Sequence, residues 1–189
     1  MRPAKDSVFI LSSGRMRAYR IVCIILVLLW MGVIFFFSSD NGEESSALSG
    51  KVTEYIARFF FRDWFTAADA AALSQRLGKL EYLVRKAAHF TEYLILGGLL
   101  ALVFSTIRMK YSGRIVLSVL IGILYAMSDE FHQSFVAGRA MQGFDVLIDS
   151  GGVIFGAIVF SGISAMIIMD FVLKRRTLRR SSEDIAEEL

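Results

Sequence analysis

Acidic and histidine side chains directly follow an apolar segment in the stretch DEFHQSFVAG, residues 129–138. It supplies Asp129, Glu130, His132 and Gln133, and the fourteen residues before it, 115–128, carry no charge. Histidine and carboxylates that are buried together can exchange protons, because burial and neighbouring charges shift their pKa values. Their nitrogen and oxygen atoms are also donors that bind divalent metals. This stretch is therefore a candidate for acid–base or metal chemistry.

A second group of polar residues lies at helical spacing in residues 85–92. Arg85, His89 and Glu92 are separated by four and then three positions, so they share one helix face. Lys86 lies about one turn before His89. Guanidinium and ammonium groups form charge-assisted hydrogen bonds to anions, so Arg85 and Lys86 could hold a phosphate or a carboxylate.

A third group follows the first along the chain. Asp145 and Asp149 are one helical turn apart, and Arg139 precedes them in a loop. On the helix before this loop, we expect Asp129 to face the other polar residues and Glu130 to point about 100° away from it. Arg139 would join the two basic residues of the second group as an anion-binding side chain.

We expect these residues to converge in one polar pocket, because charges inside a membrane normally face one another, water or a ligand. The candidates for catalysis are His89, Glu92, Asp129, Glu130 and His132. The candidates for ligand binding are Arg85, Lys86, Gln133, Arg139, Asp145 and Asp149, and those for a divalent metal, the one cofactor that the set suggests, are His89, Glu130 and His132. No serine or cysteine is framed as a nucleophile. A structural alternative stays open, in which the three basic residues neutralise the acids as an ion-paired plug.

The elements that position these residues are four membrane spans, at about residues 21–39, 89–107, 115–133 and 149–169. Hydrophobic residues make up 55% of the 189 residues and lie in long blocks, and a bilayer core needs about 20 apolar residues per helix. Two uncharged runs, 93–107 and 115–128, are too short to cross alone and must continue into the polar stretches. The fold class expected is therefore all-α, an integral membrane bundle of four helices. A cleaved signal peptide is the alternative for the first run, but FFFSSDNG lacks the usual small-residue cleavage site.

Basic residues predict the orientation of these spans. Five of them precede the first span, three flank the connection between the second and third, and five follow the fourth. Cytoplasmic loops are enriched in Lys and Arg, so we expect a multi-pass protein of the cell membrane with both termini in the cytoplasm. Residues 1–20 then form a basic cytoplasmic N-terminus, residues 21–169 the membrane domain, and residues 170–189 a charged cytoplasmic tail.

The segment 40–88 lies on the outer side in this topology. Apolar residues at helical spacing, including Leu48, Tyr55 and Phe59, predict an amphipathic helix, and the aromatic residues after it are typical of a segment at the membrane surface. A packing lid without chemistry is the alternative. Thr66 and Asp69 have the spacing of a capping box, which would begin a second, short helix extending to about residue 80.

Other partners are weakly indicated or excluded. Lys and Arg cluster beside apolar runs, where contacts with lipid headgroups explain them. The expected partner is therefore the lipid bilayer, and a nucleic acid is not expected. Cys23 is the only cysteine and lies in an apolar block, so it forms neither a disulfide nor a metal site. Gly152 and Gly156 form a GxxxG pattern that lets another helix approach closely, and a protein partner at this face is a further hypothesis. The oligomeric state is not predicted.

Three blocks of the sequence together resemble the VanZ-like family. They are FFFSSD (35–40), VRKAAHFTEYLILGGLL (84–100) and SDEFHQSFVAGRAMQGFDVLIDSGGVIFG (128–156). The patterns R-K-x-x-H-F-x-E-Y, D-E-x-H-Q-x-F-x-x-G-R and D-x-x-x-D-x-x-G occur in order, and the resemblance covers about residues 18–160. The family's motif positions fall on the candidate residues given above. Its first span often ends in S-S-Q, whereas Asp40 follows the two serines here.

The resemblance implies a small multi-spanning protein of a kind found mostly in Gram-positive bacteria and associated with resistance to the glycopeptide teicoplanin. It implies no established reaction or cofactor. The leading hypothesis is a cell-envelope protein whose outward-facing polar pocket binds or modifies a lipid-linked, cell-wall-derived or surface ligand and so contributes to glycopeptide resistance. The alternative is a membrane-embedded, metal-dependent hydrolase or transferase acting on a lipid phosphate, although the chain contains no H-E-x-x-H, E-E-x-x-x-R or P-S-G-H signature.

Overall fold

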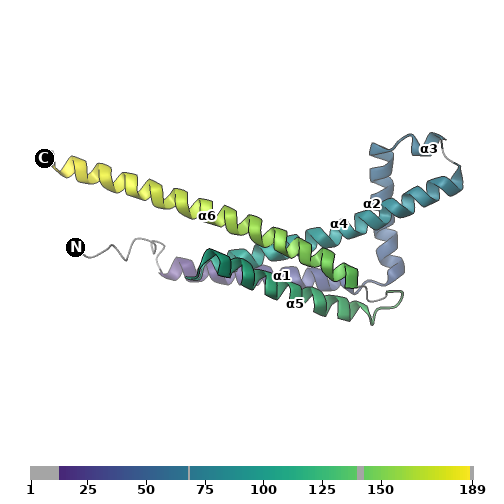
Figure 1. The fold of residues 1–189 in the computed structure, drawn as a ribbon, viewed down its shortest axis with the longest axis horizontal. Coiled ribbons are helices and arrows are strands. Elements are labelled where there is room, and N and C mark those ends of the chain that lie inside the picture. Colours follow the sequence, from purple (N-terminus) through teal and green to yellow (C-terminus); the bar gives the residue numbers. More distant parts are fainter. Residues whose placement is uncertain (1–12, 68, 140–142, 188–189) are drawn as a thin grey trace.

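The chain folds into a bundle of long helices (Figure 1). The computed structural model describes residues 13–67, 69–139 and 143–187, and these residues form helices and no strand. The helices are α1 (Ser13–Ser38), α2 (Gly42–Phe60), α3 (Trp64–Ala67), α4 (Ala70–Ser105), α5 (Tyr111–Gln133) and α6 (Gly143–Glu187). The predicted all-α fold class is confirmed.

Four of these helices are long and apolar enough to cross a membrane. The candidate spans are Met16–Ser38, Ala70–Ser105, Tyr111–Gln133 and Gly143–Asp170. Large apolar side chains such as Phe36, Leu124 and Ile167 are exposed on the outside of the bundle. A lipid environment accounts for such surfaces, since apolar patches of this extent are rare on soluble monomers. The protein is therefore a multi-pass membrane protein, as its sequence predicts.

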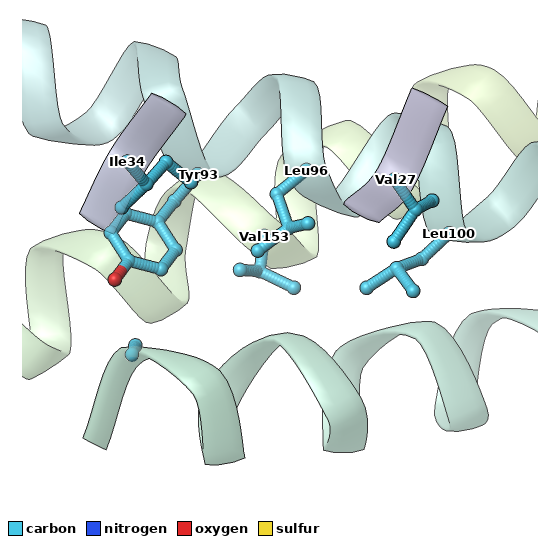
Figure 2. Packing of buried hydrophobic residues seen from close by; sticks show 7 residues of the cluster. Val27, Ile34, Tyr93, Leu96, Leu100 and Val153 are labelled. Carbon is cyan, nitrogen blue, oxygen red and sulfur yellow. The ribbon is translucent and has the colours of Figure 1, made fainter. Parts of the chain in front are cut away.

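The apolar core is formed by small and branched side chains from four helices. α4 contributes Tyr93, Leu96 and Leu100, α1 contributes Val27 and Ile34, α5 contributes Ala126, and α6 contributes Val153. Figure 2 shows Ile34 and Tyr93 at one end of this core and Val27 and Leu100 at the other. Beyond the first end the buried side chains become polar, so the core sets the inner limit of the polar region described below.

The closest packing in the molecule occurs where α4 and α6 cross (Figure 1). A Cβ atom added at Gly152 would overlap with the carbonyl oxygen of Phe90, and one added at Gly156 would overlap with that of Leu94. Glycine is therefore required at both positions for the two backbones to meet. Because α4 of the same chain occupies this face, the hypothesis that the GxxxG pattern recruits another membrane protein is not supported.

The segment between α1 and α4 contains α2, which crosses the direction of the spans and packs on α4 (Figure 1). Its packed face carries Thr53 and Ala57, both buried, and Ser49, whose hydroxyl donates to Glu81 over 2.9 Å. On the other side of the helix Tyr55 and Phe59 are exposed, Phe59 by 80%. The predicted amphipathic helix thus exists, and its aromatic residues face outward rather than into the protein.

The predicted capping box at Thr66 and Asp69 is wrong. Thr66 lies in α3 and its hydroxyl donates to the carbonyl of Asp63 over 3.2 Å. Asp69 is itself the N-cap, because its carboxylate accepts from the backbone N–H of Ala72 over 2.8 Å. The helix that begins there is also not short, since α4 continues without a break for 36 residues. Its length is about 54 Å, so its first turns extend well beyond a hydrocarbon layer of about 30 Å.

Candidate functional site

Polar and charged side chains from four helices meet at the end of the bundle where α5 ends and α6 begins. We call this set the buried polar cluster. Its members are Ser38 of α1, Lys86, His89, Glu92 and Tyr93 of α4, Asp129, Glu130 and Gln133 of α5, Arg139 of the loop after α5, and Asp145 and Asp149 of α6.

Asp129 joins three helices at the inner end of this cluster. One of its oxygens, Oδ2, accepts hydrogen bonds from the Ser38 hydroxyl over 2.7 Å and from the Tyr93 hydroxyl over 3.1 Å. The Gln133 amide donates to the same oxygen over 3.1 Å and also to Ser38 over 3.1 Å. Asp129 is only 3% exposed, and its Oδ2 atom accepts all three hydrogen bonds. The arrangement locks α1, α4 and α5 together.

Two pairs of side chains connect α4 to α6, one turn apart on each helix. Lys86 forms an ion pair with Asp145, and these side chains are 13% and 16% exposed. One turn deeper, Nδ1 of His89 lies 3.9 Å from Oδ1 of Asp149, whose side chain is 1% exposed. Neither of these two atoms has a hydrogen-bond partner among the residues that the structure describes. Asp149 is therefore much less exposed than Asp145, whereas the His89 side chain, at 17%, is about as exposed as that of Lys86.

The loop after α5 returns the chain toward α1 and places a cation beside the acids. Gly138 has a φ of 76°, a backbone conformation that side chains other than glycine disfavour. Arg139 follows and donates to the carbonyl of Phe37 over 3.4 Å. Burial and the nearby Arg85 guanidinium lower the pKa of Arg139, while the charges of Asp129 and Glu130 oppose this change. Two guanidinium groups thus lie near the cluster.

Glu130 was predicted to belong to the polar pocket, although the spacing on α5 places it about 100° away from Asp129. The side chain is nevertheless only 2% exposed, and it lies within electrostatic range of Arg139 and Asp149. The reason is that α5 has neighbours on two sides: Asp129 faces α1 and α4, whereas Glu130 lies toward α6.

Two of the candidate residues are held elsewhere by other partners. Arg85 pairs with Glu81 over 3.1 Å and donates to Ser46 of α2 over 2.8 Å. The His132 ring lies beside Phe35 of α1, with ring centroids 4.4 Å apart. Within the described ranges no three His, Cys, Asp or Glu side chains are arranged to hold a metal ion. The structure therefore does not bring His89, Glu130 and His132 together as a metal site.

Sequence reasoning missed two residues of the cluster, Ser38 and Tyr93. Both are buried and both donate to Asp129. Tyr93 lies four positions after His89, so helical spacing alone places it on the same face. Ser38 lies in the last turn of an otherwise apolar helix, where a hydroxyl indicates a polar neighbour. The signal was present in both cases, but hydroxyl residues are too common in membrane helices to single out without a structure.

The buried polar cluster combines several chemical capacities. Lys86 and Arg139 can donate charge-assisted hydrogen bonds to an anionic group. His89 and the carboxylates around it can accept or supply protons, and a carboxylate can accept hydrogen bonds from a hydroxyl or an amine. The Lys86–Asp145 ion pair is one element of the ion-paired plug that the sequence left open as an alternative, and the cluster holds more acids than bases.

Comparison with protein families gives one match. A family model described as VanZ/LLP1 matches residues 23–168, which is more than three quarters of the chain. The matched region includes every member of the buried polar cluster. Comparison with curated proteins and with solved structures gives no match.

Proposed function

The chain belongs to the VanZ/LLP1 family, and we propose that its buried polar cluster binds or modifies the polar part of a lipid-linked or cell-surface ligand. The observation that carries the proposal is the convergence of His89, five carboxylates and two cations at one end of a membrane bundle. Charges in such a place are unfavourable unless they serve one another, water or a ligand. The side chains of Lys86, His89 and Asp145 keep 13–17% of their surface exposed, which gives the cluster an approach from this end of the bundle.

The cluster faces the outer side of the cell membrane in this proposal. α1 begins and α6 ends at the opposite end of the bundle, where α4 also joins α5 (Figure 1). The basic residues that flank the spans gather at that opposite end, as cytoplasmic segments do. At that end the Arg20 guanidinium donates to the hydroxyl of Thr106 over 2.9 Å and to the carbonyl of Thr106 over 2.8 Å. Both termini are therefore assigned to the cytoplasm.

The ligand chemistry follows from the groups near the approach. Lys86 and Arg139 suit a phosphate or carboxylate, such as the head of a lipid-linked intermediate or a wall-derived peptide. The deeper acids and His89 suit hydroxyl or amino groups, which donate hydrogen bonds to carboxylates. A lipid-linked ligand could reach the cluster sideways from the outer leaflet, because its tail stays in the bilayer while its polar head enters between the helices.

α2 is assigned to the outer membrane interface in the same proposal. Its aromatic stripe is exposed and its direction crosses that of the spans (Figure 1). A helix of this kind places its apolar side chains at the boundary between headgroups and acyl chains. Arg85, the residue before Lys86 on α4, donates a hydrogen bond to Ser46 of α2. A ligand at the interface beside α2 would therefore lie next to the approach to the cluster.

Binding of an envelope ligand would reduce the access of glycopeptides, and the test is teicoplanin susceptibility. Cells that express the wild type should tolerate more teicoplanin than cells with an empty vector. A variant with His89→Ala and Glu92→Ala should lose this protection at equal membrane abundance. His132→Ala is the matched control, because that ring lies against Phe35 outside the cluster. Full protection by a well-expressed double variant would contradict the proposal.

A further inference from the structure

Negative charge exceeds positive charge inside the buried polar cluster. Its carboxylates are Glu92, Asp129, Glu130, Asp145 and Asp149, and its cations are Lys86 and Arg139. Residues 140–142, AMQ, add no charge, and Arg85 is already paired with Glu81. With a neutral His89 and all carboxylates ionised, the cluster would carry three net negative charges within a membrane protein. Such an excess is unfavourable in a medium of low dielectric constant, so bound cations are expected to reduce it.

Asp149 is a buried carboxylate whose Oδ1 atom, unlike Oδ2 of Asp129 and Oδ1 of Asp145, has no hydrogen-bond partner within the described residues. Asp129 has three hydrogen-bond donors on one oxygen, and Asp145 has the Lys86 ammonium. Asp149 is 1% exposed, its Oδ1 atom accepts no hydrogen bond within the described residues, and four other carboxylates lie within electrostatic range. The atom opposite is Nδ1 of His89, which is also without a hydrogen bond in the same part of the chain. Two titratable atoms therefore face each other in a buried place.

We propose that the pair of His89 and Asp149 binds one extra proton at neutral pH. The reference is a pair in which the imidazole is neutral and the carboxylate is ionised. The proton resides either on the imidazole, as an imidazolium beside a carboxylate, or on the carboxyl group beside a neutral imidazole. Either state lowers the net charge of the cluster from −3 to −2. An imidazolium donates from Nδ1 to Oδ1 and a protonated carboxyl group donates from Oδ1 to Nδ1, so either state supports a hydrogen bond between these two atoms once the pair closes from 3.9 Å.

Groups on all sides of the pair contribute to this site. Those from α4 are Lys86, Glu92 and Tyr93, those from α5 are Asp129 and Glu130, α6 adds Asp145, and the loop after α5 adds Arg139. α1 contributes the Ser38 hydroxyl but no titratable group. The Lys86–Asp145 pair lies one turn nearer the end of the bundle and is the route of exchange, since the apolar core closes the other side. Within the described residues no three His, Cys, Asp or Glu side chains are placed to hold a metal ion, so a proton is the cation proposed, and sodium is tested against it below.

This inference does not depend on the identity of the ligand, and spectroscopy on the full chain in lipid nanodiscs tests it directly. The chain has only two histidines, so ¹⁵N-histidine NMR reports their charge with little overlap, and His132→Ala assigns the remaining signal to His89. Infrared difference spectroscopy reports protonated carboxyl groups. At pH 7 we expect either an imidazolium at His89 or a protonated carboxyl band, and Asp149→Asn should abolish whichever is seen. Glu54→Gln, at an exposed carboxylate on α2, should abolish neither.

Three results would overturn the inference. The first is the observation, in wild-type protein, of a neutral His89 together with the absence of any protonated carboxyl group. This measurement does not depend on the folding of a variant. The second is a signal that persists in folded Asp149→Asn. The third is a dependence on sodium: if replacing NaCl by choline chloride changes the signals at constant pH, the cluster binds Na⁺ and not a proton at this position. Because teicoplanin is absent from these measurements, their failure is distinguishable from a failure of the proposed function.

Discussion

Removal of the Asp129 carboxylate tests whether the buried polar cluster holds the bundle together as the geometry indicates. In Asp129→Ala the Ser38 hydroxyl, the Tyr93 hydroxyl and the Gln133 amide lose their shared acceptor. These donors come from three helices and are buried, so no water replaces the lost oxygen without a rearrangement. Asp129→Asn keeps an oxygen that can accept, and it removes a negative charge from a cluster rich in acids.

The magnitude follows from the number of hydrogen bonds. Hydrogen bonds between membrane helices average about 0.6 kcal/mol each. Two of the bonds to Asp129 join helices and the one from Gln133 lies within α5, so three bonds of this size give about 2 kcal/mol as a lower value. Removal of one partner from a buried charged network costs about 3–5 kcal/mol in other proteins, which gives the upper value. We therefore expect Asp129→Ala to lower the free energy of unfolding by about 2–5 kcal/mol. Asp129→Asn should lower it by about 1 kcal/mol, since a neutral hydrogen bond contributes roughly that much.

Reversible unfolding in mixed micelles, followed by tryptophan fluorescence over an SDS titration, measures these differences. Ser128→Ala is the matched control, because Ser128 precedes Asp129, is exposed, and donates only to the carbonyl of Tyr125 in its own helix. It should change the free energy of unfolding by less than about 0.5 kcal/mol. The reasoning is refuted if Asp129→Ala is as stable as the control, or if Asp129→Asn is the more destabilised of the two.

Three further predictions concern packing, the interface and the outer ion pair. Gly156→Leu should lower the free energy of unfolding by about 1–3 kcal/mol or more, whereas Gly32→Leu, with no atom within 4 Å of the added Cβ, should leave thermal unfolding in detergent unchanged. A nitroxide attached at Phe59→Cys should relax faster with oxygen than with a water-soluble nickel complex, as expected at a lipid interface, and the opposite order would contradict this placement. A double-mutant cycle with Lys86→Met and Asp145→Leu should give a coupling energy of about 0.5–3 kcal/mol, and additive effects would show that the pair contributes nothing.

The membrane fold could be predicted from the sequence because its signals are long and additive. Two uncharged runs are too short to cross a bilayer, and this predicted that the spans continue through His89 and Asp129. In the structure α4 does continue through His89, and α5 through Asp129. The crossing of α4 and α6 was less predictable. A GxxxG pattern shows that a backbone approaches closely, but it does not say whether the approaching helix belongs to the same chain.

The rotation of each helix was harder to predict than its existence. Spacing along α5 gives the angle between Asp129 and Glu130, yet the burial of both depends on α5 having neighbours on two sides. His132 shows the opposite case: its spacing predicted that it shares the face of Asp129 and Gln133, and the structure packs its ring against Phe35. Arg85 was likewise drawn to α2, a helix whose position relative to α4 no local pattern specifies.

The central claim is that the buried polar cluster opens to the outer side of the membrane, and cysteine labelling in intact cells tests it most directly. In a Cys23→Ala background, which removes the only native cysteine, single cysteines replace exposed residues at the two ends of the bundle. Phe144→Cys lies at the start of α6 beside the cluster, and Ser112→Cys lies at the start of α5 at the opposite end. A membrane-impermeant thiol reagent should label Phe144→Cys in intact cells and Ser112→Cys only after permeabilisation. The reverse pattern would contradict the account.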